Sequence, residues 1–141
     1  MNLAELYKLI RRFEGCRLTP YYCPAGVLTC GWGSTGSDVF PGRPWTQDYA
    51  DARMEQDAKR FAAGTLALCP TLDGDELCAI ADFCYNLGLG RLKTSTLRKK
   101  INAGDWEAVP YELRKWVNGG GRKLPGLVLR REAEITLIKQ R

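Results

Sequence analysis

The chain has 141 residues, of which 45% are hydrophobic and 26% charged, and its formal net charge is +5. This composition is typical of one water-soluble globular domain, and no apolar run approaches a membrane span, so we expect no signal peptide, no membrane anchor and no stable membrane association. The charge indicates a solvated basic surface or an anionic polymer partner; because no nucleic-acid-binding motif accompanies it, we expect no nucleic acid.

The N-terminal segment predicts an amphipathic helix over residues 3–13. Its apolar residues recur at spacings of 3 and 4: Leu3, Leu6, Ile10 and Phe13. Gly15 ends the helix, so Glu14 lies at its C-terminal edge. The negative end of the helix dipole disfavours a charged carboxylate there, which suits a proton donor.

The next segment carries prolines and glycines at short intervals, which is typical of short strands and turns. We expect a strand over residues 27–30 and a loop rich in Gly, Ser and Pro over residues 34–44. This turn-rich part follows directly on the helix that ends near Glu14. A group at a helix end next to such a segment often lines a cleft.

Helical patterns dominate the rest of the chain. Thr46 is the predicted N-cap of a long helix that Cys69-Pro70 breaks, and Asp73 or Asp75 caps a second helix that ends at Gly88. We expect the long helix to bury four residues: Ala50, Met54, Phe61 and Leu66. Later helices are expected over residues 94–104, from an N-cap at Asp105, and from Pro125 after a loop of three glycines.

These elements predict an α+β fold that is mostly α, in one domain covering residues 1–141. A small β-rich lobe spans about residues 14–45, and a helical lobe spans about residues 46–141 together with helix 3–13. A cleft between two such lobes is a natural ligand site.

The sequence contains no histidine. This excludes Ser-His-Asp and Cys-His hydrolases and histidine-ligated zinc enzymes. A zinc site made only of cysteines needs close pairs, and the six cysteines include no C-x-x-C. We therefore expect no metal and no cofactor, and a chemistry based on carboxylates, hydroxyls, thiols, lysine or arginine.

Residues 13–36 form the candidate site. They hold Glu14, the only carboxylate between Glu5 and Asp38. A single carboxylate at a cleft can protonate a leaving oxygen, as glycosidases do, although its position alone is more typical of a surface glutamate near a helix end. Three cysteines lie in this stretch: Cys16, Cys23 and Cys30. The other three lie in apolar surroundings and are expected to be buried thiols: Cys69, Cys78 and Cys84.

The spacing of Glu14, Cys23 and Thr29, followed by Gly31-Trp32-Gly33, resembles the active-site segment of phage lysozymes, glycoside hydrolase family 24. Those enzymes carry Glu, Asp and Thr at these spacings and then Gly-x-Gly. Two later segments resemble the family's helical lobe: FCYNLGLGRLKTSTLRKKINAGDW (83–106) and LRKWVNGGGRKLPGLVLRREAE (113–134). The resemblance implies a lysozyme-like fold along nearly the whole chain.

The resemblance also implies an activity, hydrolysis of the β-1,4 bond between N-acetylmuramic acid and N-acetylglucosamine of bacterial peptidoglycan during host cell lysis. Glu14 would be the general acid, and Thr29 would hold the attacking water. Arg130 would pair with Glu14 and orient it, unless it forms only a weak surface ion pair. Three polar residues would line the saccharide cleft: Asn86, Ser95 and Thr96.

Two departures from the family pattern stand out. Cys23 occupies the position of the second catalytic carboxylate, and Ser34 stands where many members have histidine. A thiol has an ordinary pKa of about 8.5; Glu14 disfavours its thiolate, and Arg17 favours it. Cys23 therefore either supports the reaction as thiolate, or marks lost function, or acts as a switch. Ser34 is expected to alter a contact within the small lobe.

The switch hypothesis rests on a subgroup of exported phage lysozymes that shares the run Tyr-x-Cys-Pro-Ala-Gly-Val-x-Thr. In that subgroup a disulfide blocks the catalytic thiol until a thiol from an N-terminal membrane anchor displaces it. This implies a regulatory Cys16–Cys23 disulfide, with Cys30 as a third thiol for exchange. The printed sequence shows no such anchor ahead of Leu3. We therefore expect a monomer that leaves the host cytoplasm through a holin pore and acts in the periplasm. The alternative is that an anchor was removed from this chain.

Other functions remain open. A lytic transglycosylase needs one catalytic acid, because the sugar's own 6-hydroxyl attacks, and it would tolerate Cys23; Thr29 at the family spacing favours hydrolysis. A cell-wall binding protein that kept the fold and lost catalysis is a further alternative.

Overall fold

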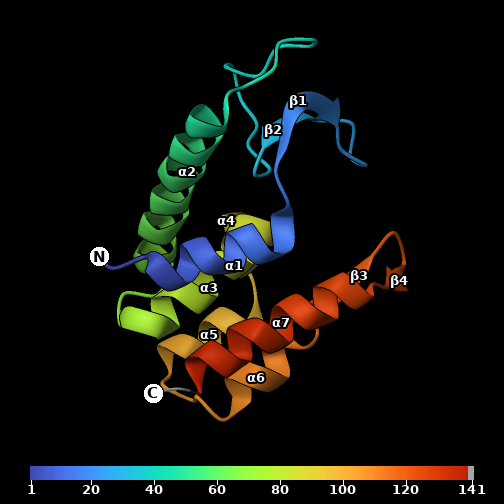
Figure 1. The fold of residues 1–141 in the computed structure, drawn as a ribbon. Helices are drawn as coiled ribbons and strands as arrows, with labels where there is room; N and C mark the ends of the chain where they lie inside the picture. The colour runs from blue at the N-terminus through green and yellow to red at the C-terminus, as the bar shows by residue number, and fades with distance from the viewer. Residues whose placement is uncertain (140–141) are drawn as a thin grey trace.

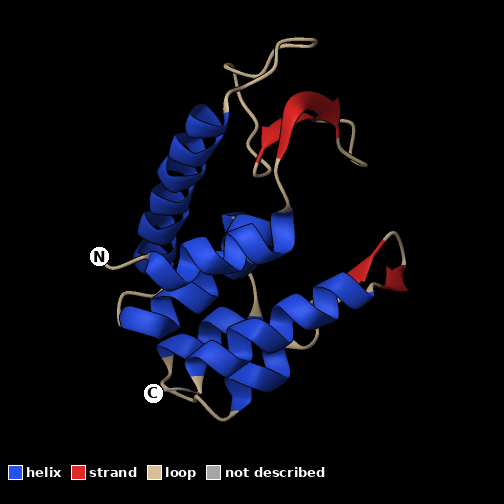
Figure 2. Ribbon diagram, viewed as in Figure 1, coloured by secondary structure: helices blue, strands red, loops and turns tan. Residues whose placement is uncertain are grey.

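The computed structural model describes residues 1–139 and has two parts, a small β-containing lobe and a larger helical lobe (Figure 1). The elements run in this order: α1 (Ala4–Glu14), β1 (Arg17–Tyr22), β2 (Leu28–Gly31), α2 (Gln47–Leu68), α3 (Gly74–Leu87), α4 (Leu89–Lys93), α5 (Thr96–Asn102), α6 (Ala108–Leu113), β3 (Asn118–Gly119), β4 (Arg122–Lys123) and α7 (Pro125–Ile138). Helices dominate, with two small antiparallel sheets, so the predicted mostly α fold is confirmed (Figure 2). Within residues 1–139, no helix combines the length and apolarity needed to cross a bilayer.

The first helix, α1, packs in the helical lobe against α3 and α7 (Figure 1). Leu6 and Ile10 are fully buried there, at the spacing that predicted the helix. Burying each such side chain stabilises the fold by about 1.5–3 kcal/mol. Because this packing anchors α1, its last residue, Glu14, is held where the chain leaves for the small lobe.

The small lobe is built on the antiparallel pair β1–β2, in which Tyr21 lies opposite Thr29. The register is interrupted between Arg17 and Tyr21, where Pro20 has no N–H to donate to the ladder. The strand expected over residues 27–30 is observed as β2, one residue later. A small core lies against this hairpin, formed by four buried residues: Cys30, Val39, Trp45 and Ala50.

The long helix α2 runs from the small lobe into the helical lobe (Figure 1). Its predicted N-cap is confirmed, because Thr46 Oγ1 accepts a hydrogen bond from the Tyr49 N–H at 3.1 Å. The buried stripe recurs every three or four residues: Ala50, Met54, Asp57, Ala58, Ala62 and Thr65. Phe61 and Leu66, which were expected to be buried, are only half-buried because they lie at the flanks of this stripe.

Ser34 links the small lobe to α2. Its Oγ donates to Asp57 Oδ2 at 2.7 Å, and both residues are buried. The expectation that Ser34 changes a contact within the small lobe is therefore corrected: its partner lies on the helix that connects the lobes. The other oxygen of Asp57 accepts from Arg53, so the carboxylate is held from two sides.

The central helix α3 is capped by Asp73, whose Oδ1 accepts from the Gly74 N–H at 2.8 Å, and it ends before Gly88 as predicted. The later helices differ in detail from the expectation. Helix α5 starts at Thr96 with Ser95 as its N-cap. Asp105 caps nothing: its carboxylate pairs with Lys100 at 3.6 Å, while α6 begins at Ala108.

The short strands β3 and β4 replace the glycine loop that the sequence predicts. Asn118 pairs with Lys123 and Gly119 with Arg122. Gly120 and Gly121 between them have φ of 59° and 80°, a conformation that favours glycine in a tight hairpin turn. This hairpin forms an arm next to the start of α7 (Figure 1).

The loop over residues 35–44 is held to α2 through Asp38. Arg53 Nε and Nη2 bind its two carboxylate oxygens at 2.7 and 3.0 Å, and Tyr49 Oη donates to Oδ2 at 2.7 Å. The hydrogen bond from Arg53, which outweighs partial burial, lowers the pKa of Asp38 to about 2. A loop rich in glycine and proline is thereby fixed by one charged contact.

Replacing Asp38 by Asn should lower the free energy of unfolding by about 1–2 kcal/mol at neutral pH, because the ion pair with Arg53 is lost. The folded pKa lies below the unfolded value, so the contribution is complete above about pH 4 and disappears as the pH falls towards about 2. Urea denaturation of wild type and Asp38→Asn across this range measures it. Glu107→Gln, which removes an exposed carboxylate, should follow wild type at every pH; a constant gap for Asp38→Asn would contradict the ion-pair account.

Candidate active site

The carboxylate of Glu14 is the centre of the candidate site. Glu14 is the last residue of α1, and Gly15, with φ of 66°, turns the chain towards β1. The Glu14 side chain is 21% exposed, and its Oε2 accepts from Arg130 Nη1 at 2.7 Å. The predicted pair is therefore formed, and Arg130 is buried rather than part of a surface ion pair.

Arg130 of α7 also binds a second carboxylate. Its Nε and Nη2 donate to Oδ2 and Oδ1 of Asp82 at 2.9 and 2.8 Å. Asp82 lies on α3 and is completely buried. One guanidinium thus joins three helices, with two of its donor atoms on Asp82 and one on Glu14.

The Gly-x-Gly segment lies against the other oxygen of Glu14. Gly33 has φ of 89°, and a Cβ at this position would lie 3.0 Å from Glu14 Oε1. Tyr85 Oη fixes the segment by donating to the Trp32 carbonyl at 2.7 Å. Burial, followed by the nearby charge of Glu14, raises the pKa of Tyr85, so Tyr85 stays a donor. Any side chain at position 33 would therefore crowd Oε1, and glycine avoids that contact.

Cys23 begins the turn that connects β1 to β2. The Gly26 N–H donates to the Cys23 carbonyl at 2.8 Å, and the Cys23 N–H donates to the Val27 carbonyl at 3.0 Å. The Cys23 pKa is lowered, first by the backbone N–H of Val27 and further by Ala25, the Thr29 hydroxyl and Gly26. This turn therefore favours the thiolate by hydrogen bonds, as oriented backbone N–H groups do for anions.

Arg17, the expected partner of the Cys23 thiolate, has another contact. Its guanidinium stacks over the Tyr21 ring at 3.8 Å. The pKa of Tyr21 is raised by burial, opposed by Arg17, and raised again by the charges of Glu14 and Cys23. The charges of Glu14 and Cys23 therefore both act on Tyr21.

Thr29 is buried in β2, and its hydroxyl donates to the Val27 carbonyl at 2.9 Å. The single hydroxyl proton goes to the Val27 carbonyl here, and rotation of the hydroxyl can direct it to the Cys23 thiolate instead. In either case the oxygen keeps lone pairs that can accept a hydrogen bond. Thr29 can therefore accept a hydrogen bond from a bound water, and its hydroxyl lies beside the Cys23 sulfur.

All six cysteines lie within the described residues, and none forms a disulfide there. Cys16 Sγ accepts from Gln47 Nε2 at 3.7 Å, so this thiol is next to the start of α2. Cys30 is fully buried, donates to the Leu18 carbonyl at 3.3 Å, and has a pKa raised by burial. The predicted Cys16–Cys23 bridge is therefore open in this structure, and Cys30 is not exposed for exchange. The three cysteines expected to be buried are buried: Cys69, Cys78 and Cys84.

The three residues expected to line a saccharide cleft differ in their surroundings. Asn86 is in the last turn of α3, and its Oδ1 accepts from Arg131 Nη2 at 2.8 Å. Ser95 is buried and serves the fold instead: its Oγ donates to the Leu92 carbonyl at 2.7 Å and accepts from the Arg98 N–H at 3.0 Å. Thr96 is exposed at the rim of a small hollow of about 200 Å³.

Asp82 and Gly33 are site residues to which the sequence reasoning assigned no role. A signal for Asp82 was present, since it is the one charged residue in the apolar run from Leu77 to Cys84. A charge on the buried face of a helix needs a partner, and buried charges are paired in folded proteins. Gly33 was noted only as part of a motif, and its closeness to Glu14 depends on the folded chain.

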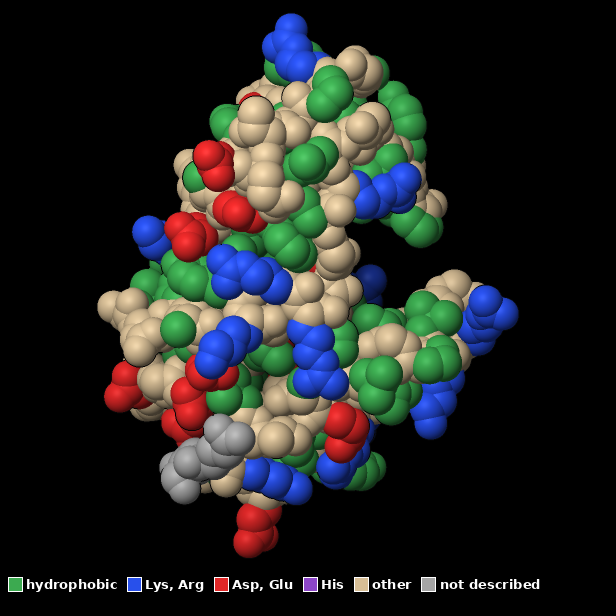
Figure 3. All heavy atoms as spheres, in the orientation of Figure 1, with side chains coloured by type: hydrophobic (Ala, Val, Ile, Leu, Met, Phe, Trp, Pro, Cys, Tyr) green, Lys and Arg blue, Asp and Glu red, His purple; other side chains and the backbone are tan. Residues whose placement is uncertain are grey.

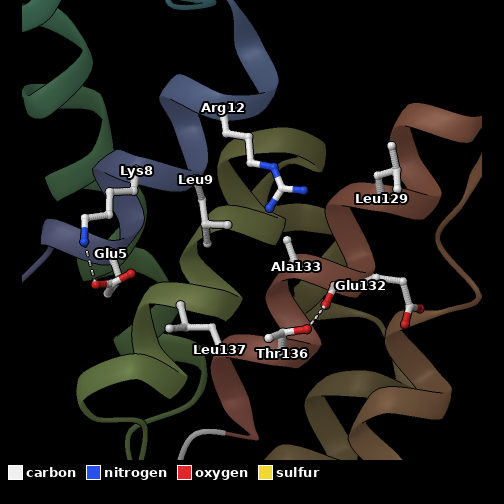
Figure 4. A pocket seen from close by; sticks show the side chains of 9 residues that line it. All are labelled: Glu5, Lys8, Leu9, Arg12, Leu129, Glu132, Ala133, Thr136 and Leu137. Atoms are coloured by element: carbon white, nitrogen blue, oxygen red, sulfur yellow. Dashed lines mark hydrogen bonds and ion pairs between the residues drawn. The ribbon is translucent and has the colours of Figure 1, made fainter.

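Two hollows mark the surface of the protein. Figure 3 shows one between the small lobe and the arm formed by β3–β4 and the start of α7. A second one, of about 360 Å³, lies between α1 and α7, with Leu9, Ala133 and Leu137 in its wall (Figure 4). Its carboxylates are engaged, Glu5 with Lys8 at 3.1 Å and Glu132 with Arg114 at 2.9 Å.

Comparison with known proteins adds to this geometry. The family profile described as Phage lysozyme matches residues 11–134. An endolysin of Acyrthosiphon pisum secondary endosymbiont phage 1 is 39% identical over 93% of this chain and 92% of its own length. The endolysin of Bacillus phage B103 is 36% identical over 98% of this chain, which spans only 54% of that relative. Among solved structures, the muramidase domain of SpmX from Asticaccaulis excentricus has a TM-score of 0.85, 26% identity, and coverage of 95% of this chain and 94% of that one.

Cys23 should react with iodoacetamide faster than any other cysteine of the native protein. Its thiolate is favoured by hydrogen bonds from the turn, whereas burial protects the four buried cysteines. Peptide mass spectrometry after short labelling near neutral pH measures this. Thr29→Val should slow the labelling of Cys23 and leave that of Cys16 unchanged; equal labelling of Cys23 and the buried cysteines would contradict the structure of the turn.

Proposed function

Since the chain belongs to the phage lysozyme family, we propose that it is a muramidase that hydrolyses the β-1,4 bond between N-acetylmuramic acid and N-acetylglucosamine. The observation that carries the proposal is the position of Glu14, at the end of α1 and bound through a single oxygen to Arg130. Glycosidases need such a positioned carboxyl group to protonate the leaving oxygen.

Glu14 is the general acid in this proposal. Its Oε2 is held by Arg130 at 2.7 Å, so Oε1, which faces Gly33, is the oxygen that delivers the proton. A positioned general acid contributes about 10²–10⁴-fold to a rate. The glycosidic oxygen receives the proton as the bond to the sugar breaks.

Thr29 and Cys23 act on the opposite side of the sugar. The Thr29 hydroxyl donates to Val27, so its oxygen accepts from the attacking water and orients it. The Cys23 thiolate, supported by the N–H groups of its turn, supplies negative charge to a transition state that resembles an oxocarbenium ion. As the water oxygen bonds to the sugar carbon, the thiolate takes up the proton that the water loses. Among the three open interpretations of Cys23, the lowered pKa of its thiol favours the one in which it works as a thiolate.

The proposed substrate is peptidoglycan, and Asn86 and Thr96 belong to the proposed saccharide-binding face. Arg130 is buried and bound to Glu14 and Asp82, so it orients Glu14 instead of binding the saccharide. The positive net charge of +5 favours encounter with an anionic cell wall. Ser95 is left out of this face because its hydroxyl caps α5. On family membership alone, we propose that the protein acts as a monomer on the periplasmic side after release from the host cytoplasm with the help of a holin.

A lytic transglycosylase is the nearest alternative reaction. The orientation of Thr29 favours hydrolysis, because its oxygen is available to a water. The chemical structure of the product distinguishes the two reactions. Hydrolysis leaves a reducing sugar end, and the transglycosylase reaction leaves a 1,6-anhydro end. A protein that binds sacculi in reductant without cleaving them would instead be a cell-wall binding protein.

Glu14→Gln should lower the rate of cell-wall lysis by at least about 100-fold, because the amide holds the same contacts but carries no transferable proton. Turbidity loss of purified sacculi, with mass analysis of the released sugar ends, measures it. Glu5→Gln on the same helix, which removes an exposed carboxylate, should keep full activity. Retained lysis by Glu14→Gln would remove Glu14 as the acid.

The redox hypothesis predicts that oxidation lowers activity by joining Cys16 to Cys23. Lysis by oxidised protein should then rise when dithiothreitol is added, and Cys16→Ser should be active with or without it. The mass of the tryptic peptides shows whether the bridge is present. If bridged and reduced protein lyse sacculi equally fast, the switch hypothesis is wrong.

A further inference from the structure

Arg130 is shared between two carboxylates that differ in their access to solvent. Its side chain is 4% exposed, that of Glu14 is 21% exposed, and that of Asp82 is fully buried. Asp82 takes the Nε and Nη2 donors, and Glu14 takes Nη1. The more buried carboxylate thus makes the stronger, two-bond contact.

This sharing has an electrostatic consequence for Glu14. An arginine that faced Glu14 alone would favour the ionised carboxylate, and an ionised carboxylate has no proton to give. Asp82 carries the opposite charge at 2.8 Å from the same guanidinium, so Arg130 presents to Glu14 a charge that is already largely balanced. Arg130 can therefore orient Glu14 without fixing it in its charged form.

The contact also has a geometric consequence. Asp82 accepts two hydrogen bonds from one edge of the Arg130 guanidinium, and these bonds fix the plane of the guanidinium. The remaining nitrogen, Nη1, donates to Glu14 Oε2. Glu14 Oε1 remains next to Gly33, on the side without a side chain. A freely rotating guanidinium has enough donors to bind both oxygens of a carboxylate.

The other charged and titratable groups near this array come from three elements. On α7, Arg131 binds Glu134 through Nε at 2.8 Å, and both are completely buried. Burial, followed by the charge of Asp82, raises the pKa of Glu134, while the charges of Arg131 and Arg130 lower it. Tyr85 of α3 and Tyr21 of β1 are within electrostatic reach of Glu14, and both have raised pKa values. The charges to be considered around Glu14 are therefore the Arg130–Asp82 pair, which contacts it, and the Cys23 thiolate, which like Glu14 acts on Tyr21.

We propose that Asp82 is a positioning residue of the reaction, acting through Arg130 to keep Glu14 both oriented and protonatable. The inference rests on the proposed function, because it assumes that Glu14 is the general acid. Asp82 touches no substrate in this scheme. Its role differs from that of a merely structural ion pair because it changes the pH range in which the enzyme works.

The test is the pH profile of kcat/KM on purified sacculi. The alkaline limb of such a profile reports the loss of the proton from the general acid. In Asp82→Asn the charge of Arg130 acts on Glu14 alone, so the limb should move to lower pH by about one unit, while activity at acid pH approaches that of wild type. The matched control is Glu132→Gln, which removes an exposed carboxylate from α7 and should leave the limb unchanged.

A second pair of variants decides the matter if Asp82→Asn does not fold. Arg130→Gln leaves the charge of Asp82 unbalanced, so the limb should move to higher pH. Asp82→Asn combined with Arg130→Gln removes both charges of a buried pair, a change that folded proteins often tolerate, and should return the limb towards that of wild type. Identical limbs in these two variants would overturn the role of Asp82.

The outcomes separate this inference from the function on which it rests. If Glu14→Gln is inactive but Asp82→Asn loses activity equally at every pH, Asp82 is only structural and the inference is wrong. If Glu14→Gln keeps its activity, Glu14 is not the acid and both the function and the role of Asp82 are wrong. A shifted limb in Asp82→Asn with an inactive Glu14→Gln supports both.

Discussion

The buried guanidinium of Arg130 is the contact on which the arrangement of the site depends. It joins the end of α1, the middle of α3 and the first half of α7 through Glu14 and Asp82. A buried charge without partners is expensive, so these helices are held in one arrangement as long as the contact exists. The same contact determines the orientation of the Glu14 carboxylate, which lies where α1 leads into the small lobe.

A second set of polar contacts holds the small lobe in relation to that carboxylate. Ser34 and Asp38 both reach α2, the first through Asp57 and the second through Arg53. Tyr85 binds the backbone of Trp32 from α3. The Gly-x-Gly segment is thus fixed from both sides, and Gly33 can approach Glu14 closely. A neutral serine at a position where many family members have histidine still connects the lobe to α2, because Asp57 accepts its proton.

Cys23 is accommodated by the shape of its turn rather than by a positive side chain. The N–H groups of the turn lower its pKa, while Arg17 stacks on Tyr21. The thiolate is therefore favoured next to a site that also contains a carboxylate. Cys16 lies at the start of α2 and Cys30 is buried under β1, so the three nearby sulfurs occupy different chemical surroundings.

The sequence by itself determined the features that depend on neighbours along the chain. The apolar period predicts α1 and so the position of Glu14 at its end, Thr46 caps α2, and Gly88 stops α3, because caps and periodicity act within a few residues. Two local predictions differ from the structure. Asp105 does not cap α6, which begins at Ala108, and the glycine loop contains a short hairpin, β3–β4. Residue composition alone does not show where a helix begins or which loop residues pair.

Tertiary structure alone decided which polar groups meet. Arg130 lies 116 residues from Glu14 and 48 from Asp82, and no local pattern relates them. The family resemblance pointed to the pair with Glu14, but not to the second partner that balances it. Ser95 caps a helix instead of lining a cleft for the same reason. A side chain's role follows from the groups that surround it, and burial together with charge pairing selects those groups only when the whole chain folds.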